Sequence, residues 1–476
     1  MNLASLIVNH PADRPALIDG DQVITYGQLR ASVAAIQQQI VDAGFGRGDR
    51  IVLAAGNEPL FAAAAFAIMG AGATVVPVNP FSPILELKRK LESVSPSLIL
   101  VGEEGHWILA EGDILDAPKI DMTNTELTEA HPEIVECDED NIAFMLLTSG
   151  VSGDSKVAML SHRNLDWVQE SITGPEGLNA DDVTLGSLPF AHIFGLNAVL
   201  LTSLRLGAKV VLQRRFDVDE SLRLIRQHQV TSLTGAPPMW QRWATADAPD
   251  DSLRSITHAT SGAAFLPIDT YNAIKDRYGV EIGEGYGLTE TSPVVSWSRG
   301  NPIKPTSVGK PLAGVEVVLV EADGTPVDEG DTGEIVVRSP GVFKGYLDAP
   351  EVTNQVLTED GWFWTGDVGV FDSEGYLYLV DRVKDLIIVS GFNVYPADVE
   401  NVIMEHPDVR GAVVVGTPHG MTGEAVVAHV SGDVSETDLD PFVRKRLAGY
   451  KCPTKYHFVD DLPIAPTGKL IRRELR

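Results

Sequence analysis

The chain has 476 residues and a formal net charge of −29. Its length is typical of two or three domains, and 44% hydrophobic with 22% charged residues is close to the globular average. These values exclude a disordered chain and a multi-span membrane protein, and the negative charge argues against nucleic acid or an anionic membrane as a general partner. Cys137 and Cys452 cannot build a disulfide framework, so we expect reduced thiols in a cytoplasmic protein.

The N-terminal segment lacks the basic and apolar regions of a signal peptide. Residues 61–78 are 18 residues without a charge, which reaches the threshold for a membrane span. Gly70, Gly72 and Pro77 interrupt this stretch. We therefore predict a buried helix that leads into a buried strand, and no transmembrane segment.

Up to about Gly300, apolar strand patterns alternate with helical patterns, which is typical of helix-covered parallel sheets. The strands predicted there are 50–54, 74–78, 98–101, 143–147, 209–212 and 255–259. The next part, to about residue 380, has short strands and tight turns, which predict a small antiparallel sheet or barrel. The last part predicts a compact α+β unit with helices at 396–405 and 438–447 and strands at 411–416 and 425–431.

A loop rich in small residues, TSGVSGDSK, follows the predicted strand 143–147, and we expect a helix after it. Its backbone N–H groups, hydroxyls and single lysine can cradle oxyanions. The spacing is not that of a P-loop, and such a loop alone is more often an ordinary turn. The candidate nucleotide-binding residues are Thr148, Ser149, Gly150, Ser152, Gly153 and Lys156.

A second candidate segment, EGYGLTE, begins at Glu284. The glycines beside Tyr286 allow its ring to lie against a flat purine. Thr289 and Glu290 offer a hydroxyl for a phosphate oxygen and a carboxylate for Mg²⁺. An ordinary β-turn with an exposed acidic side chain explains the same sequence equally well.

Three further segments near the C-terminus carry candidate residues, although each also fits a structural turn. Asp367 follows a glycine turn, and a carboxylate there can accept from both hydroxyls of a ribose, while Arg382 can donate to the same sugar or to a phosphate. Gly391 follows an apolar strand and can admit another molecule past the main chain. Lys469 lies within the last 33 residues, which carry nine Lys and Arg against three Asp and Glu. This local positive charge suits phosphates.

His192 stands alone among apolar residues in the segment PFAHIFG, which by itself is more typical of a core histidine than of an acid–base group. The sequence contains no HExxH, CxxC or clustered histidines, so we do not expect a tightly bound transition metal. It also lacks the G-x-S-x-G elbow of serine hydrolases.

The order of these segments resembles the adenylate-forming superfamily, which includes acyl-CoA synthetases, peptide-synthetase adenylation domains and beetle luciferases. The likeness runs from about Thr25 to Arg476 and is closest to the fatty-acyl and coumarate CoA ligase branch. It rests on TSGVSGDSK, PFAHIFG, SGAAFLP, GYGLTE, TGD, DRVKDLIIVSGFNVYP and PTGKLIRRELR.

This resemblance implies an α/β multi-domain fold. Residues 1–380 are expected to form a large AMP-binding domain of two helix-covered sheets, with a small β-barrel-like subdomain at about 307–380. Residues 381–384 are expected to form a hinge around Lys384. Residues 385–476 are expected to form a small mobile α+β domain.

The resemblance also assigns roles around the nucleotide. The loop 148–156 would handle the β- and γ-phosphates, Thr289 would contact the α-phosphate, and Glu290 would hold Mg²⁺. Asp367 and Arg382 would bind the ribose hydroxyls. The residues expected on the adenine side are Ser261, Gly262, Ala263, Gly285, Tyr286 and Gly287.

Three more residues receive roles in the reaction from the same resemblance. Lys469 would reach the α-phosphate and the substrate carboxylate. Gly391 would line the tunnel for the pantetheine arm of CoA. His192 would lie beside the acyl carboxylate, in an apolar region that includes Phe194 and Trp240.

The chain departs from the superfamily pattern at a few positions. Val151 stands where Ser or Thr is usual, Ser155 where Pro is usual, and Val157 where Gly is usual. Since backbone amides remain, we expect altered ATP affinity rather than lost chemistry. Ala191 stands where Phe is frequent, which affects the width of the acyl pocket.

We therefore predict an enzyme, an ATP-dependent acid–CoA ligase that forms acyl-AMP and then acyl-CoA from a fatty or aromatic acid. ATP, Mg²⁺ and CoA are the expected cofactors and co-substrates, and the oligomeric state is not readable. One alternative is an adenylation enzyme that loads an acyl carrier protein. Another is a non-catalytic nucleotide sensor, which acid-dependent ATP–pyrophosphate exchange would exclude. A luciferase-like reaction is a further, more specialised alternative.

Overall fold

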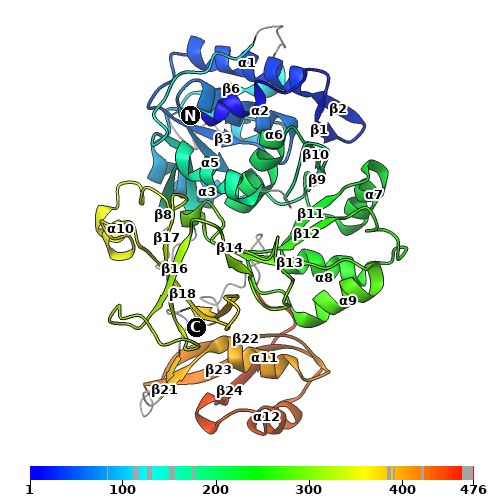
Figure 1. Cartoon of the computed structure of the whole chain (residues 1–476), viewed down its shortest axis with the longest axis vertical. Coiled ribbons are helices and arrows are strands. Elements are labelled where there is room, and N and C mark those ends of the chain that lie inside the picture. The colour runs from blue at the N-terminus through cyan, green and yellow to red at the C-terminus, as the bar shows by residue number, and fades with distance from the viewer. Residues whose placement is uncertain are drawn as a thin grey trace. The chain divides into compact units, whose positions relative to one another are not determined.

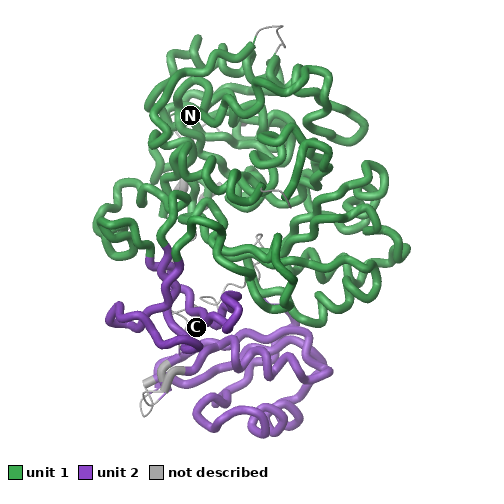
Figure 2. The backbone as a smooth tube through the Cα atoms, in the orientation of Figure 1, with its two compact units in different colours: residues 1–316, 338–363 green, residues 317–337, 364–476 purple. Residues whose placement is uncertain are grey.

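The structure is a computed structural model that describes residues 1–82, 84–110, 117–125, 131–148, 156–173, 177–382, 387–389, 392–419, 423–463 and 475. The chain divides into two compact units, shown in different colours in Figure 2. Unit 1 consists of Met1–Glu316 and Arg338–Phe363, and unit 2 of Val317–Val337 and Trp364–Arg476.

Unit 1 contains a nine-stranded sheet that is parallel in its centre (Figure 1). Its order is β15-β14-β13-β12-β11-β9-β10-β1-β2. The bounds are β1 (Pro15–Asp19), β2 (Gln22–Thr25), β9 (Val183–Gly186), β10 (Lys209–Leu212), β11 (Ser232–Gly235), β12 (His258–Ser261), β13 (Gly283–Tyr286), β14 (Ser296–Trp297) and β15 (Lys310–Pro311).

Three helices pack against this sheet: α7 (Val218–His228), α8 (Pro237–Thr245) and α9 (Ile268–Tyr278). Their apolar faces share one core with Leu233 of β11, through Leu222, Trp240 and Ile274. The strand predicted at 255–259 lies at 258–261 instead. The reason is that Ser255 still belongs to the preceding turn, where its hydroxyl donates to Val230 O.

The second sheet of unit 1 has six strands in the order β6-β5-β3-β4-β7-β8. The bounds are β3 (Arg50–Ala54), β4 (Thr74–Val78), β5 (Leu98–Val101), β6 (Lys119–Asp121), β7 (Ile142–Thr148) and β8 (Lys156–Ser161). Four predicted strands have the bounds that the structure shows. They are 50–54 (β3), 74–78 (β4), 98–101 (β5) and 209–212 (β10). Continuous apolar runs buried on both faces explain this agreement.

The uncharged stretch 61–78 folds as predicted. It consists of the buried helix α2 (Pro59–Gly70) followed by the fully buried strand β4. Helix α1 (Tyr26–Asp42) packs beside α2, and Thr25 caps its start. Among the described residues, no helix combines the length and the apolar character that a membrane span requires.

The remaining described helical segments of unit 1 connect or flank the two sheets. Their bounds are Leu3–Ile7, α3 (Ile84–Val94), α4 (Trp107–Ala110), Met122–Asn124, α5 (His162–Ile172), the π-helical segment Phe194–Leu201, α6 (Thr202–Leu206), the short 3-10 segment Thr289–Thr291 and α10 (Pro350–Val356).

Unit 2 contains most of a four-stranded sheet and a separate five-stranded sheet. The first runs β16 (Glu316–Val320), β17 (Gly333–Arg338), β18 (Phe363–Phe371) and β19 (Leu377–Arg382) in chain order. This is the small sheet that the turn-rich sequence predicted.

The five-stranded sheet has the order β21-β20-β23-β22, with β24 beside β23. Its strands and helices are β20 (Ile387–Val389), β21 (Phe392–Val394), α11 (Pro396–Met404), β22 (Val409–His419), β23 (Gly423–Gly432), α12 (Glu436–Arg444), the 3-10 turn Gly449–Lys451 and β24 (Lys455–Phe458). Both long strands exceed their predicted lengths because they pair with each other from Val409 to His419, with one irregularity in register between Val409 and Gly411. The predicted α/β fold class is confirmed.

Candidate active site

The loop TSGVSGDSK connects two antiparallel strands. Thr148 ends β7 and pairs opposite Lys156, which begins β8, and the Thr148 hydroxyl donates to Lys156 O over 3.3 Å. The predicted helix directly after the loop is therefore wrong. Residues 157–160 are apolar and extend the sheet as part of β8. Helix α5 begins at His162, and Ser161 is its N-cap, whose hydroxyl accepts a hydrogen bond from Asn164 N at 3.2 Å. Ser149, Gly150, Ser152 and Gly153 lie outside the described residues.

The residues predicted for the adenine side lie at the carboxyl ends of two parallel strands, the edge where open α/β sheets bind ligands. Ser261 ends β12 and pairs with Glu284 in β13, two residues before Tyr286. Ser261 is fully buried, and its hydroxyl has no hydrogen-bond partner among the described residues. Tyr286 is buried as well, with 7% of its surface exposed.

The SGAA segment approaches the apolar segment PFAHIFG closely. A Cβ on Gly262 would lie 3.0 Å from Cζ of Phe194, so a side chain at this position would require the Phe194 ring to shift. The next residue, Ala263, has a left-handed backbone with φ of 72°, a conformation that costs free energy for a residue with a side chain. The structure thus brings the predicted adenine-side and acyl-side segments together.

The GYGLTE turn leaves no space for a side chain at Gly287. A Cβ there would lie 1.6 Å from Pro293 O and 3.0 Å from Val294 Cα, both backbone atoms. We expect Gly287→Ala to lower the free energy of unfolding by about 3 kcal/mol or more, because the backbone must move. Urea unfolding measures this, with Gly46→Ala as the control, whose Cβ would meet nothing closer than 3.4 Å. Equal stability of both variants would contradict the predicted clash.

Glu284 is a buried carboxyl group whose pKa is raised to about 7, chiefly by burial. It accepts a hydrogen bond from Leu266 N at 3.2 Å, which partly offsets the effect of burial on its pKa. Glu58 is a second such group. It is fully buried, the Arg214 guanidinium lies 3.6 Å from its Oε2, and its pKa is also raised to about 7, chiefly by burial and by the charge of Glu103.

These raised pKa values predict how stability depends on pH. The folded protein binds protons at Glu284 that the unfolded chain releases above its ordinary carboxyl pKa. The free energy of unfolding therefore falls as the pH rises toward 7, by about 3 kcal/mol for this group. Between pH 5 and pH 8, we expect the free energy of unfolding of Glu284→Gln to fall less steeply with rising pH than that of wild type. The remaining fall is the contribution of Glu58. Urea unfolding at several pH values measures it, and an unchanged slope would contradict the assignment.

Glu290 lies in the 3-10 segment Thr289–Thr291 and is 9% exposed. Its Oε1 accepts a hydrogen bond of 2.8 Å from the hydroxyl of Tyr346, and its backbone oxygen accepts from Phe343 N at 2.8 Å. The pKa of Tyr346 is raised far above its ordinary value by burial and by the Glu290 charge, so its hydroxyl remains protonated. The Lys156 ammonium lies 4.8 Å from the centroid of the same ring.

Tyr346 was not predicted from the sequence. It belongs to KGYLDAP, a segment without a titratable cluster or glycine-rich loop. Its place depends on pairing between residues 343–347 and β8, which the bridge Ala158–Tyr346 and the bond from Met159 N to Gly345 O establish. No local sequence signal marks a pairing between segments so far apart.

In unit 2, the two predicted ribose ligands occupy neighbouring strands. Asp367 of β18 pairs directly opposite Arg382 of β19, so the backbone brings these positions together. Asp367 is 5% exposed, and its backbone N–H donates to the Thr365 hydroxyl at 3.1 Å.

His192 is half-buried at the start of the π-helical segment, where its Nδ1 accepts from Phe194 N at 3.3 Å. Trp240 and Asn197 are fully buried and have protein partners: the Trp240 indole donates to Thr260 O, and Asn197 Nδ2 donates to Ser292 O. We assign these two residues to the core that supports the predicted acyl-side segment.

Lys384, Gly391 and Lys469 lie outside the described residues. On the C-terminal side of Lys469, Leu475 packs with Leu462 on Val413 and Val427. The backbone oxygen of Leu475 also accepts from His429 Nε2 at 3.1 Å.

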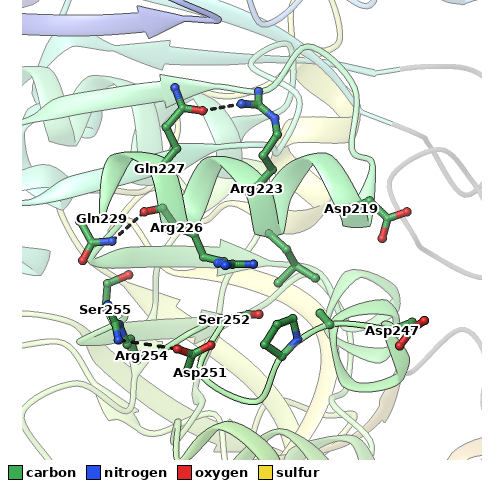
Figure 3. A pocket seen from close by; sticks show the side chains of 13 residues that line it. Asp219, Arg223, Arg226, Gln227, Gln229, Asp247, Asp251, Ser252, Arg254 and Ser255 are labelled. Atoms are coloured by element: carbon green, nitrogen blue, oxygen red, sulfur yellow. Dashed lines mark hydrogen bonds and ion pairs between the residues drawn. The ribbon is translucent and has the colours of Figure 1, made fainter.

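A hollow of about 640 Å³ lies elsewhere in unit 1, between α7 and the turn 247–255 (Figure 3). Arg226 extends toward it from α7. Arg223 forms an ion pair with Glu220 at 2.7 Å, and Arg254 forms one with Asp251 at 3.6 Å. The charges that line it are balanced, and it contains none of the predicted site residues. We therefore do not assign the reaction to it.

Sequence comparison identifies the family. The profile of the AMP-binding enzyme family matches residues 6–347, and that of the AMP-binding enzyme C-terminal domain matches residues 398–469. Feruloyl-CoA synthase from Amycolatopsis sp. is 36% identical over 97% of this chain and 95% of its own length. 4-Coumarate–CoA ligase 1 from Arabidopsis thaliana is 31% identical over 98% and 90%. The long-chain-fatty-acid–CoA ligase of Escherichia coli O157:H7 is 31% identical over 98% and 92%.

Solved structures agree with the sequence comparison. ATP-bound MatB from Rhodopseudomonas palustris superposes with a TM-score of 0.94 at 29% identity, covering all of this chain and 98% of the other. The predictions of the superfamily, the fold class and an enzyme are thus confirmed. The chain belongs to the AMP-binding enzyme family of adenylate-forming enzymes.

Proposed function

We propose that the chain is an ATP-dependent acid–CoA ligase that works through an acyl-adenylate. A carboxylate oxygen attacks the α-phosphorus of ATP, and the bond to the bridging oxygen breaks, so acyl-AMP forms and pyrophosphate leaves. The thiolate sulfur of CoA then attacks the acyl carbon, and AMP leaves with the bonding electron pair. The observation that carries this proposal is that relatives named as CoA ligases align over at least 97% of the chain. The three relatives described above are named as CoA ligases or synthases, and this supports the ligase over the sensor or a carrier-loading enzyme.

In the first step, the protein has to align two anions and offset their charge. Lys156 and Thr148, at the two ends of the glycine-rich loop, would bind the outer phosphates. Thr289 and Lys469 would contact the α-phosphate. Tyr286 and the Ser261–Ala263 segment would bind adenine, and Asp367 with Arg382 would bind the ribose.

Glu290 is suited to hold Mg²⁺. It is a largely buried carboxylate with one oxygen engaged by Tyr346, and no described residue donates to the other oxygen, Oε2. Among the described residues, no group of three or more His, Cys, Asp or Glu side chains could hold a metal alone. This suits Mg²⁺, which proteins often bind through one carboxylate together with substrate phosphates. When bound, the ion would offset phosphate charge.

In the second step, the C-terminal part would turn about Lys384, withdraw Lys469 and present Gly391 to the pantetheine arm of CoA. This requires a domain that ends near residue 380, a hinge at 381–384 and a mobile domain at 385–476. The two family profiles leave residues 348–397 between them, and the proposed hinge falls in this gap.

We propose an aromatic acid as the substrate class, rather than a fatty acid. The feruloyl-CoA synthase is 36% identical to this chain, whereas the fatty-acid ligase is 31% identical. The Phe194 ring lies so close to Gly262 that a Cβ there would come within 3.0 Å of its Cζ, so the predicted acyl-side segment presents an aromatic ring to the predicted adenine-side segment. An aromatic substrate could stack on this ring, which favours an aromatic acid.

A panel of carboxylic acids with ATP, Mg²⁺ and CoA tests this proposal. We expect hydroxycinnamic acids such as ferulate and coumarate to give the highest kcat/KM for AMP release, with acyl-CoA as the product. A preference for long-chain acids would contradict the substrate class but not the ligase reaction. AMP release that is independent of any acid would contradict the reaction itself.

A further inference from the structure

Tyr346 contacts two residues that have separate predicted tasks. Its hydroxyl donates to Glu290 Oε1 at 2.8 Å, and its ring lies 4.8 Å from the Lys156 ammonium. Lys156 ends the glycine-rich loop, and Glu290 follows the GYGLTE turn. One tyrosine, only 7% exposed, therefore joins the phosphate loop to the carboxylate proposed for the metal.

The backbone around this tyrosine leaves it little freedom. Met159 N donates to Gly345 O at 3.0 Å, and Lys344 N donates to Met159 O at 2.9 Å, so the segment is paired with β8. Phe343 N donates to Glu290 O at 2.8 Å, which fixes the other partner against the same segment. The Phe343 ring packs on the Tyr346 ring in a T-shaped contact with centroids 4.8 Å apart.

The hydrogen bond determines which oxygen of Glu290 remains for a ligand. Because the Tyr346 hydroxyl donates to Oε1 and no described residue donates to Oε2, the carboxylate is oriented with Oε2 available. A partner that orients a ligating carboxylate in this way typically contributes 10–100-fold to metal affinity.

The contact with Lys156 is of a different kind. An ammonium over an aromatic face is attracted to the negative potential of the ring, which limits where the flexible side chain can place its charge. The ring would thereby hold Lys156 near the position where the outer phosphates are expected. Removing the hydroxyl should leave this contact intact, whereas removing the ring should abolish it.

We propose that Tyr346 is a positioning residue for catalysis. Its hydroxyl orients the Glu290 carboxylate toward the divalent cation, and its ring positions the Lys156 ammonium near the phosphates of ATP. This inference rests on the proposed function, in which Glu290 holds the metal. It assigns two separable tasks to one side chain, and two substitutions distinguish them.

The test uses Mn²⁺ as a spectroscopic probe for the metal site. Free Mn²⁺ is measured by electron paramagnetic resonance during titration of the full chain with ATP present. We expect Tyr346→Phe to weaken Mn²⁺ binding about 10–100-fold, while ATP binding in EDTA stays as in wild type. We expect Tyr346→Leu to weaken Mn²⁺ binding similarly and also to weaken metal-free ATP binding about 2–5-fold.

Tyr278→Phe is the matched control. Tyr278 is also a buried tyrosine of unit 1, 8% exposed, and its hydroxyl donates to Trp243 O at 3.1 Å. Its loss removes a buried hydrogen bond without touching Glu290, so Mn²⁺ binding should stay as in wild type. Thermal unfolding of all three variants shows whether each is folded at the temperature of the titration.

Two results would overturn the inference. One is Mn²⁺ binding by Tyr346→Phe that equals wild type, and the other is an equal loss in Tyr278→Phe. A different result would identify a failure of the proposed function. If wild-type protein with ATP bound Mn²⁺ no better than ATP alone does, this would contradict a metal at Glu290. It would then also contradict the role of the Tyr346 hydroxyl in orienting Glu290. The ATP titrations in EDTA still test the task of the ring in that case.

Discussion

Replacing Lys469 by Ala is expected to reduce acyl-AMP formation by roughly 10²–10³-fold while leaving thioester formation from supplied acyl-AMP largely intact. The reason is that the first step brings a carboxylate onto a polyanion, and removing one charge-stabilising donor typically costs this much. The second step, in the proposed mechanism, takes place after this lysine has been withdrawn. Single-turnover assays of each half-reaction measure the two effects separately.

Lys445→Ala is the matched control for this variant. Lys445 is an exposed lysine in the same C-terminal region, at the end of α12, and it has no predicted role. Both half-reactions should proceed at wild-type rates. Equal losses of both half-reactions in Lys469→Ala would contradict the assignment of this lysine to adenylation alone.

Replacing Gly391 by Leu is expected to impair the second half-reaction and spare the first, the opposite of the effect expected for Lys469→Ala. A side chain in the proposed pantetheine tunnel should slow thioester formation by at least 10²-fold, because the thiol cannot reach the acyl carbon, and acyl-AMP should accumulate. Adenylation should remain close to wild type. Acyl-AMP is quantified by mass spectrometry after quenching with and without CoA.

The control for this glycine is Gly449→Leu. A Cβ at Gly449 would meet no atom within 4 Å, and its backbone is not left-handed, so a side chain fits there without strain. Its CoA-dependent rate should equal that of wild type. A Gly391→Leu variant with an unchanged thioester rate and a reduced adenylation rate would contradict the proposed exchange between two states.

The sequence predicted most of the fold because its strands are marked locally. Continuous apolar runs, such as Thr74–Val78, are buried on both faces and end at glycine, proline or polar residues. The strand β8 was missed because its apolar residues lie between a glycine-rich loop and a capping serine, a context that equally suits the start of a helix. Pairing with β7 decides between the two, and pairing is a tertiary property.

Candidate site residues could be named from the sequence where they carry recognisable chemistry in a fixed order, and their roles stay predictions. Asp367 and Arg382 are an example, since the register between β18 and β19 places their backbones opposite each other. Tyr346 was not predictable, because its contacts depend on long-range pairing with β8. The raised pKa of Glu284 was not predictable either, because it arises from burial.

The central claim, that the acid is activated as an acyl-adenylate, is tested most directly with a carboxylic acid labelled with ¹⁸O in its carboxylate. Attack of a carboxylate oxygen on the α-phosphorus places that oxygen between the acyl group and AMP, and it leaves with AMP when CoA attacks. The account predicts AMP that carries one ¹⁸O, detected by mass spectrometry, together with unlabelled pyrophosphate. Unlabelled AMP, or ¹⁸O recovered in inorganic phosphate alongside ADP, would contradict it.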